Sequence, residues 1–149
     1  MMRMDSSGAL ATDSVPARCQ QRLADCGIRP TAQRVRIASL LLSAPQHLSA
    51  EQILASLRSC GARVSKATVY NTLGLFAEHA LVREVIVEPG KVFYDPNVSA
   101  HYHFYYVDSG DLIDIPASSL EISNLPELPP DTEIERVDVV IRVRRRSTH

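Results

Sequence analysis

A chain of 149 residues, 45% of them hydrophobic, forms one domain or two small ones in water, because no apolar run approaches the roughly 18–20 residues of a membrane span. The formal net charge of -1 hides an uneven distribution, since residues 1–90 hold ten Lys and Arg against seven Asp and Glu, whereas residues 91–149 hold six against ten. We therefore expect the first part to bind a polyanion and the second part to bind something else, such as a cation.

The first half of the chain is predicted to form four helices after a flexible N-terminus, residues 1–14. The first helix covers residues 16–25. The second begins after Thr31, whose hydroxyl suits an N-cap. The third begins after Ser49, and the Ser-x-x-Gln spacing from Ser49 to Gln52 matches a capping box.

The fourth helix has the pattern of a DNA-reading helix. Ser65 is its expected N-cap, and it ends near His79. Three apolar residues recur at the spacing of one buried face: Val69, Leu73 and Phe76. The other side carries small and polar residues that fit a major groove: Ala67, Tyr70, Asn71 and Gly74, with Lys66 at its start. The helix alone leaves open that it is an ordinary polar surface helix.

Two apolar segments after the fourth helix predict a β-hairpin. Residues 81–87 are rich in β-branched side chains, residues 92–94 are apolar and aromatic, and Glu88-Pro89-Gly90 between them suits a turn. Helices followed by such a hairpin form a winged helix-turn-helix, which we expect to end near residue 95.

The second half is predicted to contain a small sheet. Residues 101–107 and 112–115 form a hairpin around Ser109-Gly110. Four prolines between residues 116 and 130 leave that segment without a regular element. From Ile134 onward, apolar residues alternate as on one face of a final strand: Val137, Val139, Ile141 and Val143.

Two histidines and an aspartate are expected to share one face of this hairpin. His101 and His103 are two residues apart on a strand, so their side chains point the same way. If Ser109-Gly110 is a two-residue turn, Tyr105 pairs with Asp114, and Asp114 then lies diagonally beside His103. Imidazoles and a carboxylate can hold a metal, but a His-x-His on a strand is more often structural, so these three residues alone leave both interpretations open.

Several short motifs occur in the order and spacing of one known family: Gly27-Ile28-Arg29-Pro30-Thr31, His47-Leu48-Ser49-Ala50-Glu51 and Ala67-Thr68-Val69-Tyr70. With them, residues 23–115 resemble the ferric uptake regulator (Fur) family. Three stretches are most similar to its iron response regulator (Irr) branch: residues 70–73, 93–95 and 112–116. The resemblance implies an α+β fold, with an N-terminal winged helix-turn-helix DNA-binding domain at residues 15–95 and a small α/β dimerisation and metal-sensing domain at residues 96–149.

The resemblance further implies one regulatory divalent metal per subunit, held by residues of both domains: His47, Asp95, His101, His103 and Asp114. Three imidazoles and two carboxylates suit Fe2+ or Mn2+, with Zn2+ as the usual tight competitor. A cation held from both domains favours one hinge angle, so that the metal level sets the affinity for DNA.

The chain departs from the family at its other ligand positions. Most members carry a Cys-x-x-Cys for structural zinc where this chain has Tyr106 and Ser109, so we expect no structural zinc. The Irr branch often shows three consecutive histidines linked to haem, and here Tyr102 interrupts the run. Haem therefore stays a second candidate effector beside the metal.

The DNA contacts implied by the resemblance come from five residues: Arg29, Arg34, Lys66, Tyr70 and Asn71. The expected partner is double-stranded DNA with an A/T-rich palindromic operator, bound by a homodimer. Arg29 is placed to enter a minor groove. Many relatives carry Arg at the position of Asn71, and because Asn pairs with adenine, the half-site preference is expected to differ.

The leading hypothesis is a metal- or haem-responsive transcriptional repressor that controls iron homeostasis genes. Asp95, where other relatives have Glu, also resembles the peroxide-sensing branch, in which iron-bound peroxide oxidises ligand histidines. A metalloenzyme with a facial triad of His101, His103 and Asp114 is a remote alternative. A third hypothesis is a structural DNA-binding protein without an effector. Since the three cysteines form no Cys-x-x-Cys and no secretory signal is evident, we expect a reducing cytoplasm and no membrane.

Overall fold

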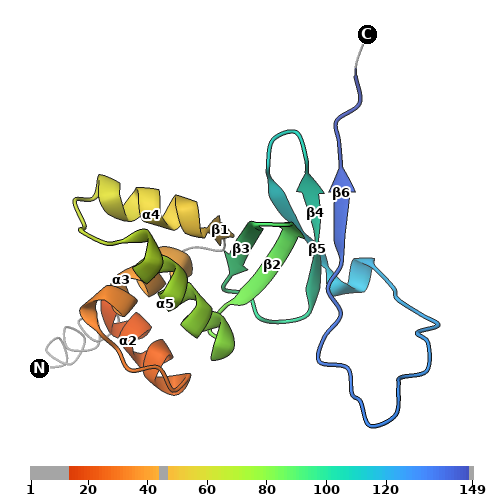
Figure 1. The fold of residues 1–149 in the computed structure, drawn as a ribbon, viewed down its shortest axis with the longest axis horizontal. Coiled ribbons are helices and arrows are strands. Elements are labelled where there is room, and N and C mark those ends of the chain that lie inside the picture. Colours follow the sequence, from red (N-terminus) through yellow and green to blue (C-terminus); the bar gives the residue numbers. More distant parts are fainter. Residues whose placement is uncertain (1–13, 44–46, 148–149) are drawn as a thin grey trace, which may run out of the picture. The chain divides into compact units, whose positions relative to one another are not determined.

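The computed structural model describes residues 14–43 and 47–147. The chain divides into two compact units, Met1–Val98 and Ser99–His149. In the described residues, helices and a small sheet form the first unit and a second small sheet forms the other, so the predicted α+β class is confirmed (Figure 1). The expected flexible N-terminus falls, except for Ser14, outside the described residues. Among the described helices, none has the length and apolar character needed to cross a membrane.

Each helix in the described part of the first unit begins at a hydroxyl side chain that caps it. The helices are α2 (Val15–Asp25), α3 (Ala32–Leu42), α4 (Ala50–Ser59) and α5 (Lys66–Glu78). The N-caps predicted at Thr31, Ser49 and Ser65 are confirmed, because each side chain accepts a bond from a backbone N–H three residues on. Gln52 also closes the predicted capping box by accepting a bond from the Ser49 N–H, at 2.9 Å.

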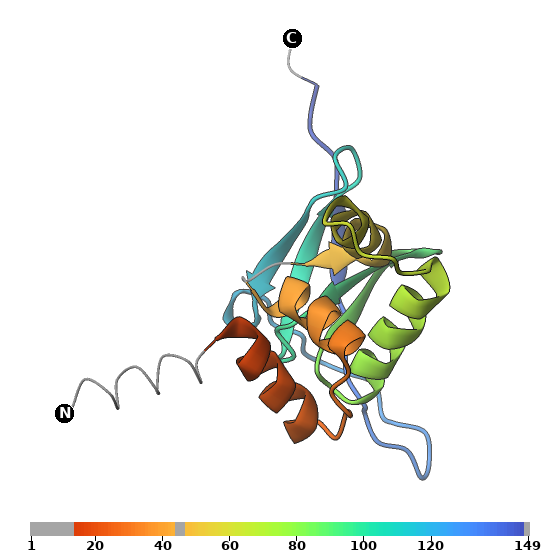
Figure 2. The same ribbon diagram turned by 90° about the vertical axis from the view of Figure 1, so that its left-hand side faces the viewer.

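The core of the first unit gathers around α5. Val69, Leu73 and Phe76 are completely buried, which confirms the predicted inward face. Fully buried side chains from the other three helices join the same cluster: Leu23, Ile37, Leu41 and Ile53. Figure 2 shows these helices side by side, with the α5 side opposite the core left open. The exposed side of α5 therefore has a fixed orientation, set by buried apolar residues over about two helical turns.

The hairpin after α5 is part of a three-stranded sheet with the order β1-β3-β2. The predicted strands are β2 (Arg83–Glu88) and β3 (Lys91–Asp95), joined at Gly90, whose φ of 78° lies in the left-handed region. The third strand, β1 (Leu48–Ser49), was not predicted, because two residues are too few to show a period. It pairs Leu48 with Tyr94 and leads directly into α4.

The second unit is a sheet with the order β5-β4-β6. It consists of β4 (His101–Tyr106), β5 (Leu112–Pro116) and β6 (Val140–Val143), with one 3-10 turn, η1 (Ala117–Ser119), after β5. β6 runs parallel to β4 and is shorter than the strand predicted from Ile134. Pairing begins where the His103 N–H donates to the Val139 carbonyl, and no strand among the described residues pairs with the alternating residues before that point.

The predicted register of the second hairpin was wrong by two residues. Tyr105 pairs with Leu112, not with Asp114, and His103 lies directly opposite Asp114. The reason is a longer turn over residues 107–110, in which the Gly110 N–H donates to the Tyr106 carbonyl at 2.8 Å. Because side chains alternate with a period of two, a slip of two residues keeps Asp114 on the histidine face.

Candidate metal centre and nucleic-acid interface

In the first unit, His47 and Asp95 lie side by side at the end of the three-stranded sheet β1-β3-β2. β1 pairs with β3 in antiparallel register, and His47 and Asp95 occupy the next opposed positions beyond Leu48 and Tyr94. The His47 Nε2 lies 3.3 Å from the Asp95 Oδ2. The Asn97 N–H donates to the other carboxylate oxygen, Oδ1, at 2.9 Å, which fixes the plane of this buried carboxylate. The pair thus presents one imidazole nitrogen and one carboxylate oxygen together.

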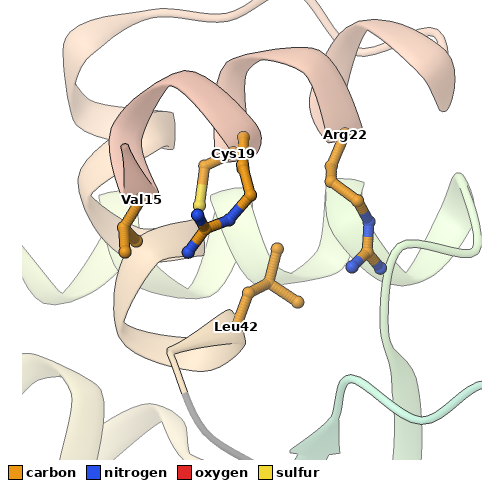
Figure 3. Close-up of a pocket in the computed structure, with 5 residues that line it drawn as sticks. Val15, Cys19, Arg22 and Leu42 are labelled. Carbon is orange, nitrogen blue, oxygen red and sulfur yellow. The ribbon is translucent and has the colours of Figure 1, made fainter. Parts of the chain in front are cut away.

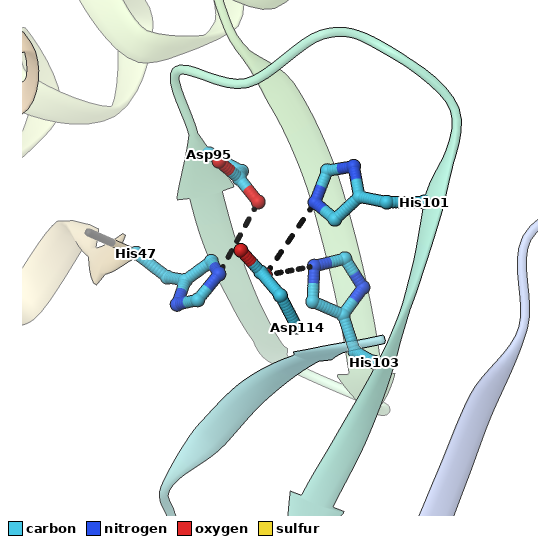
Figure 4. A group of neighbouring side chains, drawn as sticks. All are labelled: His47, Asp95, His101, His103 and Asp114. Atoms are coloured by element: carbon cyan, nitrogen blue, oxygen red, sulfur yellow. Dashed lines mark ion pairs between the residues drawn. The ribbon is translucent and has the colours of Figure 1, made fainter. Parts of the chain in front are cut away.

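In the second unit, two buried histidines converge on one half-exposed carboxylate (Figure 4). The Nε2 atoms of His101 and His103 lie 3.5 Å and 3.4 Å from the Asp114 Oδ1. The two rings contact each other with centroids 4.6 Å apart. The predicted common face of these three residues is therefore confirmed, with Asp114 opposite His103 instead of diagonal to it.

The tautomer of His101 suits a metal ligand. Its Nδ1 lies 2.8 Å from the Ser99 carbonyl oxygen, and a carbonyl only accepts, so Nδ1 carries the hydrogen. The lone pair of the neutral ring is then on Nε2, the atom that faces Asp114. A backbone carbonyl that orients a ligand imidazole in this way is common around protein metal sites.

Each of the five side chains offers one ligand atom to a cation. Imidazole nitrogens and carboxylate oxygens together fit Fe2+, Mn2+ or Zn2+ and exclude the all-thiolate chemistry of iron–sulfur clusters. The donor set therefore fits a first-row divalent metal.

The turn of the hairpin in the second unit is held by contacts of Tyr106 and Ser109. The Ser109 hydroxyl donates to the Asp111 carboxylate at 2.9 Å, and the Arg145 guanidinium lies 5.2 Å from the Tyr106 ring centroid. The Arg145 N–H also donates to the Asp108 carboxylate at 2.8 Å. A cation–π contact and these hydrogen bonds tie the end of the turn to the segment after β6.

On α5, the three predicted DNA-contacting residues are all exposed: Lys66, Tyr70 and Asn71. The Tyr70 hydroxyl donates to the carboxylate of Glu51 on α4. This hydrogen bond lowers the pKa of Glu51 and raises the pKa of Tyr70. The Lys66 ammonium lies 5.7 Å from the centroid of the Tyr70 ring.

The other two predicted DNA-contacting residues flank the start of α3. Arg29 is exposed, whereas Arg34 is half-buried and its Nη1 donates to the Arg29 carbonyl at 2.9 Å. Arg34 thus shapes the loop that carries Arg29. A guanidinium has further donors for a phosphate.

Two contacts of the candidate site residues were missed in the sequence. Glu51 and Tyr70 are 19 positions apart, and only the packing of α4 against α5 brings them together. No local pattern distinguishes Glu51 from any acidic residue in the first turn of a helix. The Ser99 carbonyl was also missed, because every residue carries such a group.

One surface hollow lies between α2 and the end of α3 (Figure 3). It is lined by Val15, Arg18, Cys19, Arg22 and Leu42. Its volume of about 100 Å³ is below the range of roughly 300–1,000 Å³ typical of small-molecule sites. Cys19 is itself buried, and the Ser39 hydroxyl points at its sulfur from 3.5 Å. The hollow is therefore smaller than a typical small-molecule site, and the thiol that lines it is buried.

Comparisons with known proteins agree on one family. The model of the ferric uptake regulator family matches residues 25–141. The peroxide-responsive repressor PerR of Staphylococcus aureus is 31% identical over 113 residues, which cover 75% of this chain and 76% of that protein. The structure of the ferric uptake regulator from Pseudomonas aeruginosa with manganese is 26% identical, covers 86% of this chain and 98% of that chain, and has a TM-score of 0.65. The ferric uptake regulator of Vibrio cholerae, at 23% identity and a TM-score of 0.64 over 84% of this chain and 98% of that one, shares the fold.

Proposed function

Since this chain belongs to the ferric uptake regulator family, we propose that it is a homodimeric repressor of transcription whose affinity for DNA depends on a bound divalent metal. The observation that carries the proposal is the presence of two histidine–carboxylate groups, one in each unit of the chain. Members of the family regulate transcription, so regulation, and not catalysis, is the proposed role of these ligands.

One ion shared by the two groups is the simplest assignment. His47 and Asp95 supply two donors, His101, His103 and Asp114 supply three, and Fe2+ or Mn2+ prefers about six. Only residues 96–100 separate Asp95 from His101, so the Cα atoms of these two residues lie within about 20 Å of each other even when the chain between them is fully extended. Neither group alone completes a coordination sphere, and a short tether makes sharing favourable.

A shared ion converts metal concentration into DNA affinity. The ion stabilises those arrangements of the two units in which all five donors reach it. If the DNA-binding form of the dimer is one of them, metal and DNA bind cooperatively, and if it is not, they compete. A difference of about 100-fold in metal affinity between the two forms changes DNA affinity by the same factor.

We propose Fe2+ or Mn2+ as the resident ion, with Zn2+ as competitor. The relative from Pseudomonas aeruginosa was determined with manganese, which supports this class of ion. The chain has no cysteine after Cys60, so the proposal includes no structural zinc on the second hairpin. Haem is the alternative effector, because the sequence resembles the Irr branch. We further propose that the protein acts in the cytoplasm and controls genes of iron homeostasis.

DNA is proposed to be an A/T-rich palindrome read by α5. Tyr70 and Asn71 face outward from this helix, and Lys66 lies at its N-terminus, where a phosphate is favoured. Arg29 and Arg34 are proposed phosphate or minor-groove contacts.

The proposal is tested by DNA binding at fixed salt with each effector in turn. The duplex is the one that the purified protein selects from a random-sequence library, and its affinity is measured without metal and with Fe2+, Mn2+, Zn2+ or haem. We expect at least about a tenfold change with Fe2+ or Mn2+, the size of a typical coupling energy. The proposal is contradicted if the protein selects no DNA sequence, or if its affinity for the selected duplex is the same with and without every metal and haem.

Peroxide sensing is the second candidate function. It is favoured by Asp95 and by the 31% identity to a peroxide-responsive repressor. In this case hydrogen peroxide, in the presence of iron, adds one of its oxygen atoms to the imidazole of His101 or His103, and its other oxygen atom leaves as water. Mass spectrometry of the peptide that contains both residues reports the added atom, which we expect with Fe2+ and not with Mn2+. An unmodified peptide from the iron-loaded protein excludes this candidate.

A further inference from the structure

Glu51 is an acidic side chain in an unexpected place, on the face that the proposed function assigns to DNA. A carboxylate near a polyanion repels phosphates and lowers affinity for every sequence. Glu51 nevertheless accepts the hydrogen bond of Tyr70, an outward residue of α5. We propose that Glu51 is a positioning residue, which holds the Tyr70 ring in the orientation that reads DNA sequence. This inference rests on the proposed function.

The acceptor is on a rigid element. Glu51 lies in the first turn of α4, and that turn is fixed by the reciprocal bonds of the capping box between Ser49 and Gln52. Ser49 also belongs to β1, which pairs with β3. The carboxylate therefore starts from a well-defined backbone position, and a bond to it restrains its partner.

The Tyr70 ring is restrained at two points. Its hydroxyl donates to Glu51, and the Lys66 ammonium lies 5.7 Å from its centroid. The side chain is 37% exposed, so packing alone does not select one rotamer. The Glu51 carboxylate at the hydroxyl and the Lys66 ammonium over the ring select the rotamer instead.

A fixed tyrosine ring affects specificity more than affinity. Apolar contact with a thymine methyl group depends on where the ring edge lies in the major groove, whereas phosphate attraction does not. Without the restraint, the ring can contact several different bases, and the difference in affinity between DNA sequences becomes smaller. The expected signature is thus a smaller ratio of affinities for selected and unselected DNA.

The test uses the full-length protein and the duplex that it selects from a random-sequence library, with a scrambled duplex of the same composition as reference. Four variants are compared with the wild type at one salt concentration: E51A, E51Q, Y70F and E51A/Y70F. The matched control is E78A, which removes another exposed carboxylate from the end of α5. Thermal unfolding of each variant separates loss of specificity from loss of folding.

We expect E51A and Y70F each to reduce the selected-to-scrambled ratio about threefold to tenfold, as for loss of one hydrogen bond to a charged group at an exposed site. The double variant should lose no more than either single one. E51Q keeps an acceptor, so it should retain the ratio within about twofold while both affinities rise through the lost negative charge. E78A should leave the ratio unchanged.

Two results overturn the inference while leaving the proposed function intact. If E51A and E51Q have the same ratio of affinities for the selected and scrambled duplexes, Glu51 acts only through its charge. Losses that add in the double variant mean that Glu51 and Tyr70 act independently. A wild-type protein without any preferred duplex overturns the inference together with the proposed function.

Discussion

Replacement of His103 by alanine is expected to remove most of the stabilisation of the protein by metal. His103 is 3% exposed, and its Nε2 lies 3.4 Å from the Asp114 Oδ1, so the change removes one of three donors in the second unit. Metal at about 100 times its dissociation constant stabilises the folded state by about 2.7 kcal/mol. For a chain of this length, this raises the unfolding midpoint by about 5–10 °C.

The variant has a calculable residual effect. If losing the imidazole weakens metal binding about 100-fold, the same metal concentration equals the new dissociation constant and stabilises by only about 0.4 kcal/mol, or about 1 °C. Because the substitution also opens a cavity in a buried region, each protein is compared with its own metal-free form. The assay is thermal unfolding followed by circular dichroism, with and without Mn2+.

Two further variants complete this experiment. H79A is the control, because His79 is the C-cap residue of α5, its ring Nδ1 lies 3.0 Å from the Cys26 carbonyl oxygen and it is no proposed ligand, so the variant should keep the full metal shift. D95A removes a donor from the other unit and should lose most of the shift if one ion is shared. A full shift in H103A refutes the assignment of the ligands, and a full shift in D95A refutes the shared ion.

Three other predictions concern the metal content, the core and a buried phenol. Metal analysis should find no more than one ion per chain, removable by a chelator without loss of far-ultraviolet helix signal, whereas a second ion that resists chelation would reveal structural zinc. Phe76→Ala should lower the free energy of unfolding by about 3–5 kcal/mol in urea titrations, because this ring is fully buried on the inward face of α5, and a cost below about 1 kcal/mol would contradict the described core. Burial, with help from the nearby Glu84, raises the pKa of Tyr94 to about 12, so the metal-free protein should lose stability between pH 10 and pH 12, where the unfolded phenol ionises and the folded one does not. In Y94F the loss of stability between pH 10 and pH 12 should be smaller than in the wild type, and an equal loss would contradict the raised pKa of Tyr94.

The helices were the most predictable part of the fold. A hydroxyl cap and apolar residues three and four apart are local signals, and at Thr31, Ser49 and Ser65 both occur together. The two-residue strand β1 was unpredictable because it exists only through its pairing with β3. The length of β6 depended likewise on the extent of its partner β4.

The candidate site was predictable where alternation alone decides it. His101 and His103 share a face in any strand, and Asp114 joined them although the predicted turn was too short. The turn was misjudged because its length follows from bonds among Tyr106, Ser109, Gly110 and Asp111, which Ser109-Gly110 alone does not specify. Contacts between helices distant in sequence, such as the bond from Tyr70 to Glu51, have no local signal at all.

The coupling between metal and DNA tests the central claim most directly. The dissociation constant for the selected duplex is measured with and without Mn2+, and the dissociation constant for Mn2+ is measured with and without that duplex, at one salt concentration. Linkage requires the same factor in both directions. We predict a common factor of at least about ten in the wild type and a factor near one when both His101 and His103 are replaced by alanine. A duplex affinity that ignores Mn2+ in the wild type, or an undiminished factor in the double variant, would contradict the account.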